Sequence, residues 1–172
     1  MKKLLFILSA LCSHAFAQDY KEGIRSKDGF TPVYQSISSG SQSTYYNPAS
    51  VTRYGLIDKN KEIVLPLIYL AVMSTYEPGI YIVKDTMEME GLYNAFTKQF
   101  ITAREFYEID VFTNGLSIVK KSQEGGGFLW GAIDTNGTVV IPVKYDYLGI
   151  YHDGLMNFKK DDRYGFIDRT TR

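Results

Sequence analysis

The sequence predicts an all-β fold, built as a short array of antiparallel, three-stranded β-meander repeats. The stretch YGLIDKNKEIVLPLIYLAV, residues 54–72, is echoed later by WGAIDTNGTVVIPVKYDYL, residues 130–148. Within each stretch apolar residues alternate between two faces with a period of two, which indicates strands rather than helices. Turn-forming residues such as Asn136-Gly137 separate the alternating runs, as they do in β-hairpins.

Residues 1–17 are predicted to be a secretory signal peptide. Lys2 and Lys3 precede an apolar run, and Ala15 and Ala17 provide the small residues that a signal peptidase requires. The run is about half of the ~20 apolar residues that a membrane-spanning helix needs. No later segment is long enough to span a membrane. We expect a periplasmic or extracellular protein, with lipid attachment at Cys12 as an alternative that the bulky preceding leucine disfavours.

Residues 18–53 form an N-terminal segment in front of the clear repeats. The stretch GIRSKDGFTPVYQSI from Gly23 resembles a shortened repeat, and SSGSQSTYYNPAS reads as a polar loop. The outermost unit of a repeat array has to differ from the inner units, because one of its faces has no neighbour. We therefore expect a degenerate capping repeat here, with a plain leader segment as the alternative.

Residues 54–172 form the repeat domain, with units of about 54–90, 91–129 and 130–163 and a partial unit at 164–172. Each full unit has an opening strand, a turn, a return strand that Pro142 is expected to end in the third copy, and a third strand of the type GLSIVK. Spacings of this size indicate a repeat architecture, in which each unit buries its apolar face on a neighbour. Trp130 is expected to fill the junction between the second and third units. A small closed propeller-like ring, with the last unit pairing near residues 30–34, is the alternative arrangement.

The motif formed by an aromatic-Gly pair, Ile-Asp, a turn glycine, Val-Ile-Pro and Tyr-Asp, followed by Gly-Leu-x-x-Val-Lys, resembles the WG repeat family, also called KWG repeats. The third copy matches almost throughout, whereas the first has Lys61 in place of the turn glycine. The second copy has Glu90 in place of the aromatic residue and Thr102 in place of the proline. The resemblance covers roughly residues 54–168. It implies the repeat fold and an occurrence in bacterial secreted and surface proteins, and it implies no catalytic residues.

Composition and motifs argue against an enzyme, a metal protein and a nucleic-acid binder. The 19 Lys and Arg residues balance 19 Asp and Glu residues, and no basic stripe is present. His152 has no candidate nucleophile in the mature chain, because the single cysteine lies in the predicted signal peptide. The stretch DTNG from Asp134 lacks the later acidic ligands of a calcium loop. The stretch EGGGF from Glu124 lacks the Lys-Ser/Thr of a phosphate-binding loop. We expect no catalytic residue, metal or cofactor.

Two groups of residues are candidates for an interaction surface. Where the third copy has lysine, aspartate and glycine, the first copy has Ile68, Leu70 and Met73. Such a change from polar to apolar predicts that these residues are covered, either by residues 18–53 or by a partner. Tyr147 and Tyr151 lie outside the repeated positions and could stack on a sugar ring or a peptide.

These observations favour an exported, non-enzymatic repeat protein that acts as a protein-interaction module in the bacterial envelope. The expected partner is another protein, and cell-wall glycan is a second possibility; no nucleic-acid partner is expected. A periplasmic toxin-immunity or scaffold protein is one alternative function. A cell-wall glycan binder that uses Tyr147 and Tyr151 is the other.

Overall fold

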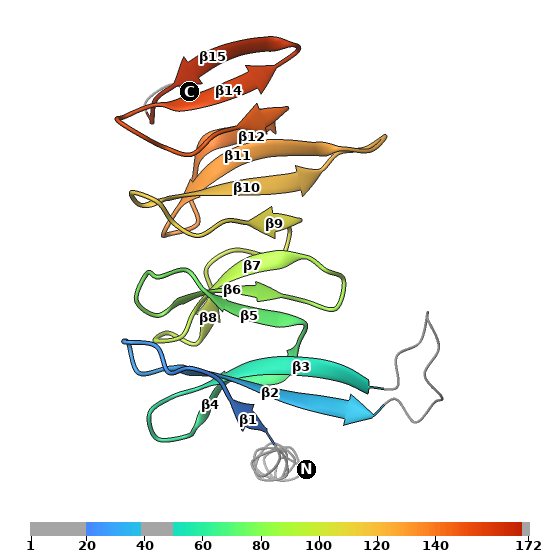
Figure 1. Cartoon of the computed structure of the whole chain (residues 1–172), viewed down its shortest axis with the longest axis vertical. Helices are drawn as coiled ribbons and strands as arrows, with labels where there is room; N and C mark the ends of the chain where they lie inside the picture. The colour runs from blue at the N-terminus through green and yellow to red at the C-terminus, as the bar shows by residue number, and fades with distance from the viewer. Residues whose placement is uncertain (1–19, 39–49, 170–172) are drawn as a thin grey trace, which may run out of the picture.

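The computed structural model describes residues 20–38 and 50–169, so the predicted signal peptide lies outside the described residues. The described residues contain fifteen strands and no helix. The strands form four small antiparallel sheets that stack along one axis (Figure 1). The all-β prediction is confirmed. Within the described ranges, no helix is long and apolar enough to cross a membrane.

Each sheet is a meander, because its strands are hydrogen-bonded in sequence order. The first sheet contains β1 (Lys21–Glu22), β2 (Thr31–Ser38), β3 (Ser50–Ile57) and β4 (Ile63–Tyr69). The second contains β5 (Ala71–Ser74), β6 (Ile80–Lys84), β7 (Glu90–Asn94) and β8 (Gln99–Phe100). The third contains β9 (Glu108–Ile109), β10 (Leu116–Ser122), β11 (Phe128–Asp134) and β12 (Val139–Tyr145). The fourth contains β13 (Tyr147–Leu148), β14 (Met156–Lys160) and β15 (Arg163–Ile167).

Each of the later sheets combines strands from two neighbouring sequence copies. The opening strands, which carry the repeated glycine, are β3, β7, β11 and β15, and the return strands are β4, β8 and β12. Strand β6 closes the first copy but pairs with opening strand β7 of the second, with Val83 opposite Gly91. In the same way, Val119 of the second copy lies opposite Gly131 of the third. The boundary between sequence units therefore falls inside a sheet, and each copy links two sheets covalently.

The alternative of a closed ring is wrong. Among the described residues β15 pairs only with β14, and β2 pairs with β1 and β3 rather than with the last copy. The first and last sheets lie at opposite ends of the stack (Figure 1). Because each sheet covers the face of the next, the array grows in one direction and its ends do not meet.

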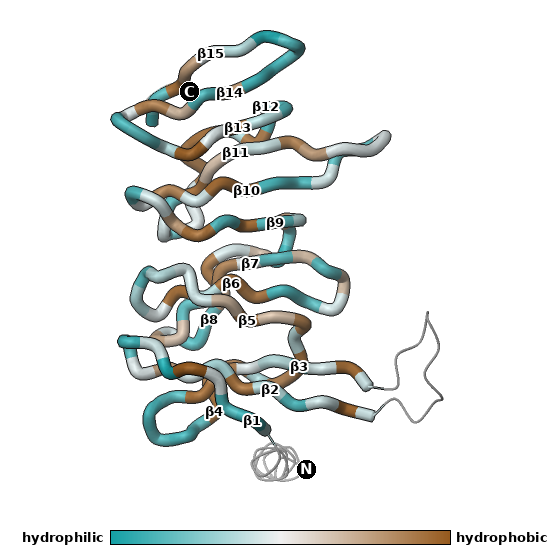
Figure 2. Tube along the Cα trace, in the orientation of Figure 1, coloured by the Kyte–Doolittle hydropathy of each residue, from teal (hydrophilic) through white to brown (hydrophobic). Residues whose placement is uncertain are grey.

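The core is divided into layers between the sheets. Neighbouring side chains of a strand point to opposite faces, so Ile82 and Val83 of β6 belong to different clusters. One cluster joins the first and second sheets through residues such as Leu56 and Tyr81. Another joins the third and fourth sheets through residues such as Ala132. The hydropathy of the chain follows this pattern, with hydrophobic residues concentrated in the strands (Figure 2).

The predicted Asp134 turn forms as expected, and the turn between β6 and β7 has the same form. Asp134 Oδ1 accepts hydrogen bonds from the backbone N–H groups of Asn136 at 2.9 Å and Thr138 at 2.8 Å. Gly137 adopts a φ of 77°, the left-handed conformation that glycine tolerates best. Asp85 makes the same two bonds in the connection between β6 and β7. In that turn Glu88, with a φ of 63°, occupies the position that Gly137 has in the third copy.

One expectation about the third copy is wrong, and another holds in part. Pro142 does not end the return strand, since β12 continues to Tyr145. A proline is tolerated there because β12 is the last strand of its sheet and needs no donor on its outer side. Trp130 packs, as expected, on the cluster that joins residues of the second and third units, such as Ile118 and Ala132, but it is only partly buried. Its ring centroid lies 5.2 Å from that of Tyr147. Lys120 Nζ lies 4.3 Å from the indole centroid.

Candidate functional site

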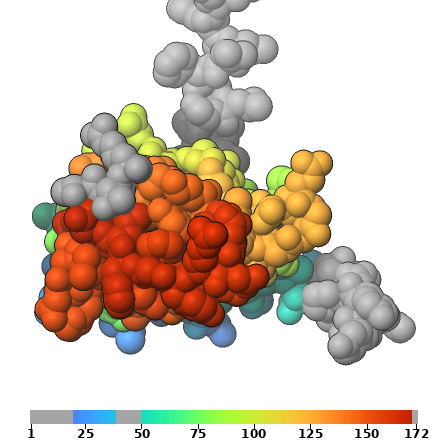
Figure 3. All heavy atoms as spheres, turned by 90° about the horizontal axis from the view of Figure 1, so that it is seen from above, coloured from blue at the N-terminus to red at the C-terminus, as the bar shows by residue number. Residues whose placement is uncertain are grey.

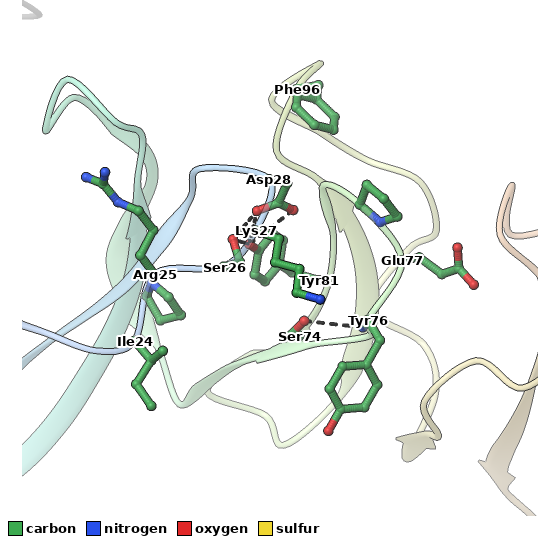
Figure 4. A pocket seen from close by; sticks show the side chains of 12 residues that line it. Ile24, Arg25, Ser26, Lys27, Asp28, Ser74, Tyr76, Glu77, Tyr81 and Phe96 are labelled. Carbon is green, nitrogen blue, oxygen red and sulfur yellow. Dashed lines mark hydrogen bonds between the residues drawn. The ribbon is translucent and has the colours of Figure 1, made fainter.

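A cleft of about 730 Å³ lies between the first and second sheets (Figure 4). One wall is the loop between β1 and β2, which carries Ile24, Arg25 and Lys27. The other wall is the loop between β5 and β6, with Phe96 contributed by the loop that follows β7. The cleft therefore forms where the N-terminal segment meets the first full repeat.

The loop between β5 and β6 is longer than its counterparts in the other copies. In the second copy Asn114 and Gly115 alone join Thr113 to Leu116, with φ values of 53° and 73°. Positive φ at both central residues is the mark of a tight type I′ turn. In the first copy the four residues 76–79 stand between Thr75 and Ile80. This longer loop presents Tyr76, which has a φ of 66° and is 85 % exposed.

A carboxylate at the floor of the cleft holds the two walls together. The backbone N–H of Gly79 donates to Asp28 Oδ2 at 2.5 Å, and the Tyr81 hydroxyl lies 3.3 Å from Asp28 Oδ1. The Ser26 hydroxyl donates to the same carboxylate and lies 2.9 Å from the Tyr81 hydroxyl (Figure 4). Asp28 thus fastens the N-terminal loop to the second sheet.

The electrostatics of this network favour a charged Asp28 beside a neutral Tyr81. Burial raises the pKa of Tyr81 to about 12; the hydrogen bond with Ser26 opposes the shift, and the charge of Asp28 adds to it. Burial disfavours the charged form of Asp28, but hydrogen bonds from Ser26, Gly79, Phe30 and Tyr81 together lower its pKa below 3.8. Both oxygens of the carboxylate accept hydrogen bonds from the protein. The arrangement therefore suits a structural anchor better than a general base.

The rim of the cleft combines exposed apolar side chains with the positive charges of Arg25 and Lys27 on one wall and the carboxylate of Glu77 on the other. Ile24 and Phe96 are 93 % and 60 % exposed, and both line the cleft with Tyr76. Lys27 makes no ion pair among the described residues, and the side-chain hydrogen bond of Arg25 is a long one of 3.4 Å to Thr31 Oγ1. These groups are suited to bind an extended segment that carries apolar and acidic side chains.

The Asp28→Asn variant is expected to lose about 1–3 kcal/mol of unfolding free energy at neutral pH, because its amide cannot accept all the bonds of the carboxylate. The folded-state pKa of Asp28 is lowered, so this stabilisation is present above the unfolded value near 3.8 and is lost as the pH falls through the folded-state value. The unfolding free energies of parent and variant should therefore approach each other in acid. Urea unfolding of both proteins at neutral pH and near pH 3 would measure this. Asp153→Asn is the matched control. The side chain of Asp153 is 90 % exposed, so this variant should lose little unfolding free energy.

The predicted residues Ile68, Leu70 and Met73 lie on the run that carries the chain from the first sheet to the second, outside the cleft. Ile68 is 57 % exposed, Met73 is 40 % exposed and Leu70 is partly exposed. The described residues of the N-terminal segment leave Ile68 and Met73 open to solvent. Cover by a partner remains a prediction.

The predicted tyrosines Tyr147 and Tyr151 each contact a different neighbour. Tyr147 is 42 % exposed and packs against Trp130. The guanidinium of Arg169 lies 4.4 Å from the ring centroid of Tyr151. Among the described residues no ring contact joins the two tyrosines. The side chain of His152 is 84 % exposed, and its Nδ1 lies 3.1 Å from Asp153 Oδ2.

Sequence reasoning missed the cleft, although the sequence contained one signal for it. The signal is the insertion at Tyr76-Glu77-Pro78-Gly79, where the later copies have Asn-Gly and Asp-Gly. The contribution of residues 24–28 was hidden because their contact with the second sheet spans about fifty residues of sequence, as between Asp28 and Gly79.

Comparison with known proteins bears on the repeats. A family model described as WG containing repeat matches residues 54–85, 91–123 and 130–164, which together make up more than half of the chain. No curated protein matches the chain. In the described part of the chain, no group of three or more His, Cys, Asp or Glu side chains could hold a metal ion.

Proposed function

The chain belongs to the family of WG containing repeat proteins, and from this premise we propose that it is an exported, non-enzymatic protein-interaction module of the bacterial envelope. Stacked repeats offer an extended surface for binding, because each unit contacts only its neighbours. The observation that carries the proposal is the cleft between the first two sheets. Export is supported by Lys2 and Lys3 and by the apolar run that follows them within residues 1–17.

The chemistry of the cleft indicates the kind of partner. Exposed aromatic side chains provide a large apolar contact area, as at many protein interfaces. Tyr76 and Phe96 are of this type, and Arg25 and Lys27 add positive charge on one wall. The partner we propose is therefore a protein segment that places an apolar side chain in the cleft and a carboxylate near the basic wall.

The test is retention of a partner from the envelope fraction of the native host by the immobilised mature chain. We expect Tyr76→Ala with Phe96→Ala to retain at least tenfold less of that partner, because both side chains project from the fold and their loss removes contact area. Val111→Ala with Val139→Ala is the matched control, since these valines are 45 % and 49 % exposed and do not line the cleft. Equal retention by the parent and both double variants would contradict the proposal.

A further double variant tests the surface at Ile68 and Leu70 in the same assay. Ile68→Lys with Leu70→Asp gives the first copy the polar residues of the third. If this variant stays folded and loses a partner that the cleft variant retains, the interaction surface lies on the run from β4 to β5 instead of in the cleft.

Binding of cell-wall glycan is a second candidate function, because Tyr147 and Trp130 form an aromatic pair. Their ring centroids are 5.2 Å apart, and Lys120 lies over the indole. Sedimentation with purified peptidoglycan would test this function. Binding that is lost in Tyr147→Ala with Tyr151→Ala, and kept in the cleft variant, would favour the glycan over a protein partner.

A further inference from the structure

Among the described residues, the last sheet has an open edge. Each of the first three sheets has four strands and ends in a return strand, whereas the fourth sheet has three strands among the described residues. Its final strand, β15, pairs only with β14 in the described part of the chain. The outer backbone groups of an edge strand are a template for pairing with another chain.

Strand β15 has the register of an opening strand. Lys159 lies opposite Tyr164, as Lys120 lies opposite Trp130 in the third sheet. The repeated glycine of β15 lies opposite Phe158, the counterpart of Val119. In the first and third sheets a return strand lies beside the opening strand, whereas β15 has the same pairing edge with no such neighbour in the described part of the chain.

The side chains of β15 are exposed where their counterparts are covered. Phe166 is 73 % exposed, whereas the equivalent Leu56 and Ala132 are fully buried. Tyr164 is 77 % exposed, whereas Trp130 packs on the core. Figure 3 looks onto this end of the stack, where residues of the last sheet form the surface nearest the viewer. An aromatic pair on an open edge indicates a binding surface.

We propose that the outer edge of β15 binds an extended segment of another protein, which adds an antiparallel strand to the last sheet. The required chemistry follows from the return strands, which place an aliphatic residue and a tyrosine four positions later. Leu65 lies opposite Leu56 and Tyr69 opposite Tyr54, and Ile141 and Tyr145 repeat this in the third sheet. The bound segment thus sets its aliphatic residue against Phe166 and its tyrosine against Tyr164. Backbone hydrogen bonds supply affinity and the two side chains supply specificity.

The occupant is another protein rather than a second copy of this chain. The two segments of this chain that carry the aliphatic-Pro-x-x-Tyr pattern, 65–69 and 141–145, are already paired with β3 and β11. A second copy could donate either segment only by dismantling its own sheet. This inference does not rest on the cleft.

The test uses a fluorescent peptide with the sequence of residues 138–146, TVVIPVKYD, and the full mature chain. Fluorescence anisotropy should show binding that weakens at least tenfold when the peptide carries Ile141→Asp and Tyr145→Asp. The Phe166→Lys protein should also bind at least tenfold more weakly while its circular dichroism stays that of the parent. Met87→Lys is the matched control, because Met87 is 80 % exposed and distant in sequence from β15; it should bind as the parent does.

Hydrogen exchange locates the bound peptide independently of any substitution. Backbone amides within residues 163–167 should exchange at least tenfold more slowly when the peptide is bound. Absence of binding, binding that Phe166→Lys does not weaken, or protection confined to other strands would overturn the inference. A chain that is dimeric alone and becomes monomeric in Phe166→Lys would also overturn it, since the edge would then serve a second copy. The cleft variants are not used here, so failure of this test leaves the proposed function standing.

Discussion

Replacing Gly131 by alanine is expected to cost about 3 kcal/mol of unfolding free energy or more, because the return strand crosses the opening strand at this residue. A Cβ atom at position 131 would lie 2.7 Å from the carbonyl oxygen of Ile141 and 2.8 Å from Cα of Val143. The strand pairing shifts register between Trp130 and Ala132, which brings the two backbones together. Gly131 does not have a positive φ, so the close approach alone requires glycine.

Urea unfolding of Gly131→Ala and of Gly127→Ala distinguishes two reasons for a glycine. Gly131→Ala reports the cost of the close backbone contact, and Gly127→Ala reports the cost of a positive φ. Gly127 has a φ of 85°, and a Cβ atom at this position would have no neighbouring atom within 4 Å. Alanine there is therefore expected to cost only the conformational penalty of about 1–2 kcal/mol. Gly55→Ala should resemble Gly131→Ala, since its Cβ would lie 2.6 Å from the carbonyl oxygen of Leu65. An equal loss in Gly131→Ala and Gly127→Ala would contradict the explanation from the return strand.

Replacing Glu90 by leucine is expected to cost about 3 kcal/mol, because this carboxylate bonds to both the second and third sheets. Glu90 is 3 % exposed and stands where the other copies have an aromatic residue. Its Oε2 accepts the backbone N–H of Ile109 at 2.8 Å, and its Oε1 lies 3.0 Å from Lys84 Nζ. Leucine would leave the N–H of Ile109 buried without an acceptor. Lys84 is partly exposed, so water compensates part of the lost ion pair.

A matched series distinguishes the two bonds of Glu90. Glu90→Gln keeps an acceptor for Ile109 and should lose about 1 kcal/mol. The hydrogen bond to Glu90 is the main cause that raises the pKa of Lys84 above 10.5. The stabilisation from this bond is complete below the unfolded-state pKa of Lys84 and is lost as the pH rises through its folded-state pKa. Parent and Glu90→Gln should therefore converge in strongly alkaline solution. Thermal unfolding that ranks Glu90→Leu equal to Glu90→Gln would show that the bond to Ile109 contributes little.

Local sequence was sufficient to predict the opening strands, their turns and the repeat. The alternation around Ala132 and Ile133 reports the two faces of a strand, and the Asp134 turn depends on residues within four positions. These features involve neighbours along the chain, so the residue types themselves specify them. In the Asp85 turn the positive φ falls on Glu88, so no glycine marks its form in the sequence.

Only the tertiary structure decided which strands share a sheet and where a ligand could bind. The sequence marks β6 as a strand, but its pairing with β7 of the next copy depends on contacts that alternation does not encode. The candidate residues Ile68, Leu70 and Met73 were chosen by comparing copies, whereas the cleft is made by residues 24–28 and 74–81 with Phe96. Asp28 reaches Gly79 only because the first two sheets stack. Residue types and spacing specify a strand and its faces, whereas the neighbour of each face is selected by packing across the whole chain.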